Sequence, residues 1–192
     1  MTKHIAFIVV EDFADWEHGL LSAAMRSYFG GTTAFHTPGG GEVTSNGGLT
    51  INPQGSIEAL DPAGYDALVV IGSSVWDQPQ APDVSAQLQA ALDAGKVVGA
   101  ICGATVAAAR AGVLEGRAHT SNGPDYLMSN AARYCGHDRY VETPRAVRDG
   151  LVVTAPGSAP ATFATGVLAA LYPERAEAVA DFEALCAIEH RA

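Results

Sequence analysis

The stretch Lys96-Val97-Val98-Gly99-Ala100-Ile101-Cys102-Gly103-Ala104-Thr105-Val106-Ala107-Ala108-Ala109 decides the fold. Its apolar first half predicts a strand, and its alanine-rich second half predicts a helix. Cys102 and Gly103 stand between them, which is the layout of a nucleophile elbow. Amides at the start of the helix would lower the pKa of the Cys102 thiol. The alternative is a buried cysteine in a tightly packed corner, since free cysteine is among the most buried residue types.

Strands and helices alternate along the rest of the chain. Buried strands are predicted at residues 4–10, 32–37 and 65–71, and helices at 15–29, 84–94, 125–134, 158–172 and 173–190. Short strands are expected at 118–121, 140–142, 146–147 and 151–154, and a hairpin joins 43–44 to 49–51. We therefore expect one α/β domain over residues 1–192. Its sheet is doubly wound and mostly parallel with helices on both faces, and a small antiparallel hairpin is added.

Composition excludes several classes of function. The 192 residues are 48% hydrophobic, enough for a sizeable core, and the net charge of −10 argues against nucleic acid or an anionic membrane as partner. The apolar run near the N-terminus is too short for a signal peptide or a membrane span. Three cysteines in such a chain predict reduced thiols and a cytoplasmic location. No cysteine–histidine pattern has metal-ligand spacing, so neither a metal nor another cofactor is expected.

Small or polar residues follow three of the predicted strands, at 11–17, 72–76 and 102–105. In a doubly wound fold, ligands bind outside the carboxyl ends of the strands. The three segments are therefore expected to meet at one site.

Several motifs, in order, resemble the PfpI-type superfamily, which includes PfpI-like proteases and the Parkinson's-linked deglycase and is related to class I glutamine amidotransferases. They are Ala14-Asp15-Trp16-Glu17, residues 47–51, 65–70, Ala100–Thr105 (Ala-Ile-Cys-Gly-Ala-Thr), 116–122 and 149–159. The likeness covers residues 4 to about 172 and is nearest to a bacterial glutamine amidotransferase-like subgroup. It implies a flavodoxin-like fold and a homodimer.

By resemblance, Cys102 matches the family's nucleophile, and Glu17 matches an acidic residue that hydrogen-bonds the cysteine and is usually protonated. The residues themselves agree in part, because a carboxyl in an apolar pocket beside a thiolate has a raised pKa. The alternative for Glu17 is a solvated carboxylate in the first turn of a helix.

Two positions depart from the family pattern. Asn122 stands where many members have histidine, and an amide cannot act as a base. His119 would point to the opposite face of a strand, so we expect it to pack structurally. Gly72-Ser73-Ser74 replaces two consecutive glycines, although the backbone there and at Gly103 can still form an oxyanion hole.

Other candidates for the pocket each have an ordinary structural alternative. Trp76 and Trp16 are candidates for lining the pocket; the alternative is that they are aromatic residues of the core or of an interface. Ser74 would narrow the pocket, or else cap a turn. Pro156 and Gly157 match a family loop beside the nucleophile, or else precede a helix cap. Cys135 and Cys186 are expected to be inert packing thiols.

The favoured function is a cysteine-dependent hydrolase or lyase acting on a small carbonyl, amide or aldehyde compound. The alternative is a redox or stress sensor that works by oxidation of Cys102. An intracellular peptidase is less favoured because Asn122 replaces the histidine. A glutaminase is disfavoured because the chain has no His-x-Glu motif.

Overall fold

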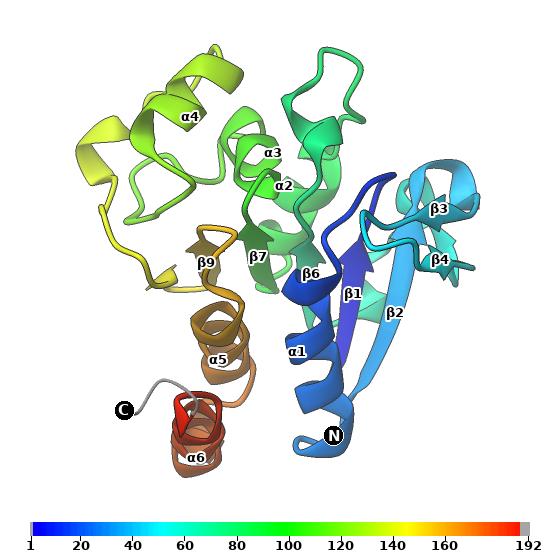
Figure 1. The fold of residues 1–192 in the computed structure, drawn as a ribbon, viewed down its shortest axis with the longest axis vertical. Coiled ribbons are helices and arrows are strands. Elements are labelled where there is room, and N and C mark those ends of the chain that lie inside the picture. The colour runs from blue at the N-terminus through cyan, green and yellow to red at the C-terminus, as the bar shows by residue number, and fades with distance from the viewer. Residues whose placement is uncertain (1, 189–192) are drawn as a thin grey trace.

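The computed structural model describes residues 2–188 and contains one seven-stranded sheet in the order β5-β2-β1-β6-β7-β9-β8 (Figure 1). All neighbouring strands are parallel except β8 and β9, which are antiparallel. A separate antiparallel hairpin holds β3 and β4. The predicted fold class is therefore confirmed. The strands are β1 (His4–Ile8), β2 (Thr32–Thr37), β3 (Val43–Thr44), β4 (Thr50–Ile51), β5 (Gly55–Ser56), β6 (Ala67–Val70), β7 (Val97–Ile101), β8 (Val147–Asp149) and β9 (Val152–Ala155).

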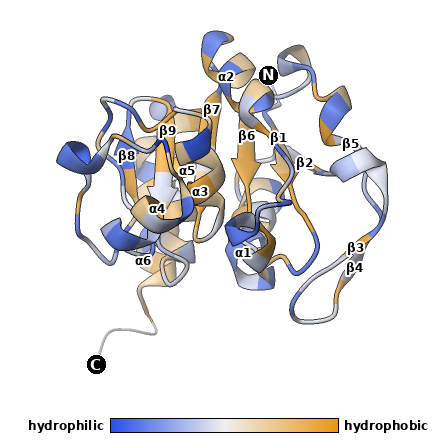
Figure 2. Ribbon diagram, turned by 90° about the horizontal axis from the view of Figure 1, so that it is seen from above, coloured by the Kyte–Doolittle hydropathy of each residue, from blue (hydrophilic) through white to orange (hydrophobic). Residues whose placement is uncertain are grey.

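Helices cover both faces of the sheet because the central strands are apolar on both sides. Alternate residues of β1 face two different cores: Ile5 and Phe7 face one, and Ala6 and Ile8 face the other. Figure 2 shows β6 and β7 as a hydrophobic centre between the helices. On the Phe7 side lie α1 (Asp15–Ser27), α5 (Pro160–Leu171) and α6 (Ala176–Cys186). On the other side lie α2 (Ser85–Asp93) and α3 (Ala104–Arg110), with α4 (Pro124–Asn130) against α3.

Two predicted strands are wrong. Residues 118–121 and 140–142 make only an isolated bridge between His119 and Tyr140. Side chains take the backbone groups that a strand ladder would use: the Tyr140 hydroxyl bonds to the amide and the carbonyl of Ser121, and Thr154 accepts from the amide of Thr120.

The other boundaries shift by a few residues. A 3-10 turn at Pro173–Arg175 precedes α6, which therefore begins three residues later than expected. The predicted end of this helix, His190, lies outside the described residues. Within the described part of the chain, no helix has the length and apolar character needed to cross a membrane.

Candidate active site

Cys102 occupies the turn between β7 and α3. Its φ of +58° lies in the left-handed region, which is unfavourable for a residue with a side chain. The turn is held on both sides, because the Cys102 amide donates to Ala155 O at 2.9 Å and Thr105 Oγ1 donates to Cys102 O at 2.6 Å. Strain that is maintained in this way is typical of functional sites.

Glu17 in the first turn of α1 is fully buried and turned towards this cysteine. Its Oε2 accepts a 2.7 Å hydrogen bond from the amide of Gly72, which follows β6. A methyl group added to Gly157 would lie 2.7 Å from Cys102 Sγ and 3.2 Å from Glu17 Oε1. Both atoms therefore border the same small space, and Glu17 is not the solvated carboxylate of the alternative interpretation.

The strands β1 and β7, which precede α1 and α3, are not neighbours in the sheet. The starts of the two helices are therefore not brought together by adjacent strands. The strand β6 lies between β1 and β7, and its continuation at Gly72 links the two. Only glycine fits there, because a methyl group at residue 72 would lie 2.5 Å from Glu17 Oε2 and 2.7 Å from Cys102 Cβ.

Burial raises the pKa of Glu17 to about 7, although bonds from Gly72 and Cys102 oppose the shift. The raised pKa agrees in direction with the expectation that the Glu17 carboxyl is usually protonated. Near neutral pH, such a carboxyl can both accept and return a proton.

The expected low pKa of the Cys102 thiol is wrong in direction. Burial, and then the charge of Glu17, raise the thiol pKa, while the Asn122 amide and the Gly103 N–H lower it by a smaller amount. The helix start does favour the thiolate, but removal of the thiol from water outweighs it. Proton transfer to Glu17, rather than a permanently ionised sulfur, is therefore the activation that this geometry allows.

Asn122 contacts the sulfur directly. Its Nδ2 donates to Cys102 Sγ at 3.3 Å, and its Oδ1 accepts from the Gly157 amide at 3.0 Å. The Gly157 carbonyl accepts from the indole N–H of Trp16 at 3.0 Å. Asn122 thus orients the sulfur and the loop, and its amide supplies no base.

The sulfur opens onto a pocket of about 260 Å³. The predicted residues Ser73, Ser74, Gly103 and Asn122 line it together with Cys102, Glu17 and Gly72. The Gly72 amide is already bound to Glu17, so its expected role as an oxyanion donor is wrong. Among the described residues, no carbonyl oxygen accepts from the amide of Ser73 or Gly103.

Two predicted pocket residues lie elsewhere. Trp76 is fully buried in the core beside α2 and α3, and its indole N–H donates to Ile71 O, so it does not line the pocket. A large aromatic after a buried strand is drawn into the core by its apolar area. Pro156 lines a neighbouring hollow on the other side of Asn122.

His119 has a structural role, as expected. His119 is fully buried and bonds to Arg117 O and to the Tyr134 hydroxyl. His18 packs among the rings of three phenylalanines. Cys135 is exposed, so its predicted packing role is wrong, whereas Cys186 is half-buried in α6.

Sequence reasoning missed Asn46 and Asp77, which line the pocket, and it included Asp12 only as part of the segment 11–17; Tyr126, a weaker candidate in α4, also lines the pocket. Asp12 and Asp77 follow the ends of β1 and β6, and this position was the signal that could have identified them. Within the described residues, no group of three His, Cys, Asp or Glu side chains is placed to hold a metal ion.

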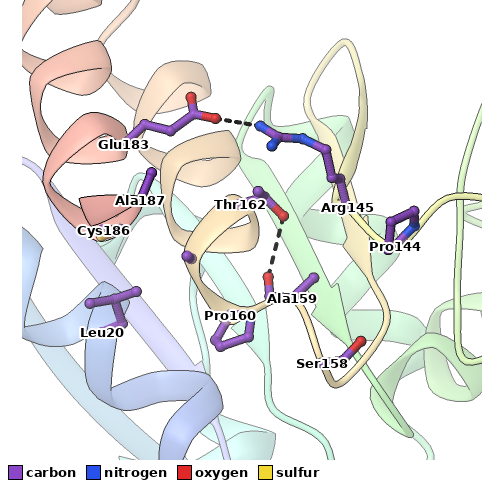
Figure 3. Close-up of a pocket in the computed structure, with 11 residues that line it drawn as sticks. Leu20, Pro144, Arg145, Ser158, Ala159, Pro160, Thr162, Glu183, Cys186 and Ala187 are labelled. Carbon is purple, nitrogen blue, oxygen red and sulfur yellow. Dashed lines mark hydrogen bonds and ion pairs between the residues drawn. The ribbon is translucent and has the colours of Figure 1, made fainter. Parts of the chain in front are cut away.

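A larger hollow of about 400 Å³ lies between the start of α5 and the end of α6. Figure 3 shows Leu20, Pro160 and Ala187 around it, with an ion pair between Arg145 and Glu183 on one side. None of the predicted site residues lines this hollow. The candidate active site is therefore the smaller pocket at Cys102.

Fold and site define a class of parallel α/β proteins with a cysteine at the turn after a central strand and a buried carboxyl beside it. The model of the DJ-1/PfpI family matches residues 3–170, and the chain belongs to this family.

Individual relatives support this assignment. The chain is 34% identical over 174 residues to a Bacillus subtilis protein named "Uncharacterized protease YoaZ", covering 87% of this chain and 82% of that protein. The crystal structure of the DJ-1 superfamily protein Atu0886 from Agrobacterium tumefaciens is similar at 43% identity and a TM-score of 0.92, covering 99% of this chain and 100% of that chain. A ThiJ/PfpI family protein from Bacillus anthracis is similar at 30% identity and a TM-score of 0.87, covering 98% and 92% of the two chains.

Proposed function

We propose that this protein is a cysteine-dependent hydrolase or lyase of small carbonyl, amide or aldehyde compounds. The observation that carries the proposal is the common space shared by Cys102 Sγ and the buried carboxyl of Glu17. A nucleophile on a strained turn and a proton acceptor beside it are the two parts that such chemistry needs.

With an amide substrate, Glu17 takes the thiol proton as Cys102 Sγ forms a bond to the carbonyl carbon. The developing oxyanion faces the amides of Ser73 and Gly103. The C–N bond then breaks, the amine leaves with the proton from Glu17, and water hydrolyses the thioester. The thiol is thereby restored and a carboxylic acid is released.

An activity screen tests the proposal, with 2-oxoaldehydes, amides and short peptides as substrates. We expect turnover by the wild type, none by Cys102→Ser, and a loss of about a hundredfold or more in Glu17→Gln. Cys135→Ser is the matched control, since this exposed cysteine lies outside the pocket. Equal activity of Cys102→Ser and wild type would refute the proposal, and turnover of peptides alone would favour a peptidase.

A redox sensor is the second candidate, and Asn122 favours it. A histidine at this position could assist turnover, whereas the amide only donates a hydrogen bond to the sulfur. Glu17 Oε1 has no N–H or O–H donor among the described residues. Oxidation of Cys102 to a sulfinic acid would place an oxygen atom beside it as a hydrogen-bond partner. Peroxide titration followed by intact mass separates the two functions: selective oxidation of Cys102 without turnover of any carbonyl compound supports the sensor.

The homodimer implied by the family resemblance belongs to the same proposal. Light scattering of the purified chain at several concentrations tests it, with a mass of two chains as the expected result. A mass of 19.8 kDa at all concentrations would show a monomer.

A further inference from the structure

The pocket in front of Cys102 carries charge of one sign. Asp12, Glu17 and Asp77 line it, and no Lys, Arg or His is found among the described residues of its wall. Hydroxyl groups fix the two outer carboxylates in place, because Ser74 donates to Asp12 and Tyr126 donates to Asp77. Carboxylates around a small concave site concentrate negative potential there.

The exposed ring of Trp16 also points to a ligand with positive charge. Trp16 lines the pocket and is 52% exposed, although its indole N–H is held by Gly157 O, so the ring is fixed in position and its surface is open. Glu17 is fully buried beside Cys102, so the carboxylates that a ligand can reach are those of Asp12, which is exposed, and Asp77, which is half-buried. An open indole face beside carboxylates is a typical cation-binding arrangement.

We propose that the pocket at Cys102 selects small carbonyl compounds that carry an ammonium or guanidinium group, held between Trp16 and the carboxylates of Asp12 and Asp77. Compounds with a carboxylate next to the reacting carbonyl, such as 2-oxo acids, are repelled by the same charges. The carbonyl in this inference rests on the proposed function, whereas the charge preference concerns the pocket itself.

The charge preference can be measured without any substrate. The reagents are 2-aminoethyl methanethiosulfonate, a cation, and 2-sulfonatoethyl methanethiosulfonate, an anion. Each forms a disulfide with the thiol and releases methanesulfinate. Peptide mapping gives the rate at Cys102, and the cation-to-anion rate ratio is compared with the ratio for 2-mercaptoethanol, a thiol with no other charged group. We expect the ratio at Cys102 to exceed that of the free thiol by about tenfold or more, since each carboxylate contributes on the order of threefold to tenfold.

Neutral variants assign the effect to the pocket. Asp12→Asn and Asp77→Asn should each lower the ratio by roughly threefold to tenfold. Asp93→Asn is the matched control, because it makes the same change in net charge far from the pocket. Asp93 is exposed at the end of α2, near the amino ends of the strands, whereas Cys102 lies at their carboxyl ends. The ratio of this control variant should equal that of the wild type. High salt should lower the wild-type ratio towards the free-thiol value. This test uses the wild type alone and does not depend on the folding of any variant.

The outcomes separate this inference from the proposed function. A ratio at Cys102 equal to that of the free thiol, or one that neither variant nor salt changes, overturns the charge preference. Turnover of neutral aldehydes without a charge preference would support the proposed function and refute this inference. A strong charge preference without turnover of any carbonyl compound would do the reverse: the pocket would bind cations, and the hydrolase or lyase proposal would fail.

Discussion

Glu17 shows how burial changes the chemistry of a single residue. Its carboxyl lies in the first turn of α1, where a charged form would be favoured on the surface, but it is fully buried against Gly72 and Cys102. Removal from water raises its pKa to about 7, which brings its proton transfer into the neutral range.

Stability should therefore depend on pH through Glu17. Between the ordinary value of 4.5 and the folded value of about 7, the folded state keeps a proton that the unfolded state has released. The free energy of unfolding then falls as pH rises, by on the order of 3 kcal/mol. Glu17→Gln has no such proton, so its stability relative to the wild type should increase across this window. Urea unfolding at several pH values measures both proteins, and parallel curves would contradict the prediction.

The space beside the Cys102 sulfur leaves no room for a side chain at residue 157, so glycine is required there. A methyl group there would lie 2.7 Å from Cys102 Sγ, closer than real contacts allow. We expect Gly157→Ala to lose about 1–3 kcal/mol of stability and to slow alkylation of Cys102 by tenfold or more. Gly19→Ala is the matched control, because no atom lies within 4 Å of its added methyl group. It should stabilise α1 by about 0.5–1 kcal/mol and leave the alkylation rate unchanged.

At the level of the elements, α3 is fastened to the site by Thr105. This residue is fully buried, and its hydroxyl donates to Cys102 O and lies 2.6 Å from Ser121 Oγ. These side-chain hydrogen bonds join the start of α3 to the strained turn and to the loop before Asn122. Sequence periodicity predicts the helix but contains no information about this contact.

A double-mutant cycle tests the joint between Thr105 and Ser121. Thr105→Val keeps the shape of the side chain and removes its hydroxyl, so it should lower stability by about 1–3 kcal/mol. Ser121→Ala should cost less, and the double variant should cost less than the sum of the two, because the second change removes a partner that is already lost. Chemical denaturation gives the three free energies. Strict additivity would show that the hydroxyl groups do not interact.

For the whole molecule, one sheet separates two cores and carries the site at the carboxyl ends of its central strands. The helix α5 approaches the centre of the sheet closely because Gly99 in β7 has no side chain: a methyl group there would lie 3.0 Å from the Phe163 ring. The site therefore depends on packing behind the sheet as well as on the loops in front of it.

Phe163 is expected to be a major contributor to stability. It is fully buried in the core beside α1 and α5, and Phe163→Ala should lower the free energy of unfolding by about 3–5 kcal/mol. Leu49→Ala, in the hairpin loop with 51% exposure, is the control and should change stability by less than about 0.5 kcal/mol. Calorimetry or urea unfolding measures both. A small loss for Phe163→Ala would mean that the core closes around the deleted ring.

The sequence by itself determined the architecture. Continuous apolar runs as short as Val97–Ile101 are typical of strands buried on both faces, and their alternation with helices predicts a mostly parallel sheet. Because ligand sites lie at the carboxyl ends of such strands, the stretches around Glu17, Gly72 and Cys102 could be assigned to one site before the structure was known.

Only the tertiary structure decided which side chains and amides face that site. Trp76, the Gly72 amide and Asp77 all follow the same strand. Trp76 is drawn into the core and the Gly72 amide is bound to Glu17, whereas Asp77 lines the pocket. The pKa of Cys102 was likewise misjudged, because the helix start is a local feature whereas burial is set by the entire fold. Strand periodicity reflects the local chain, but solvation and hydrogen-bond partners come from residues distant in sequence.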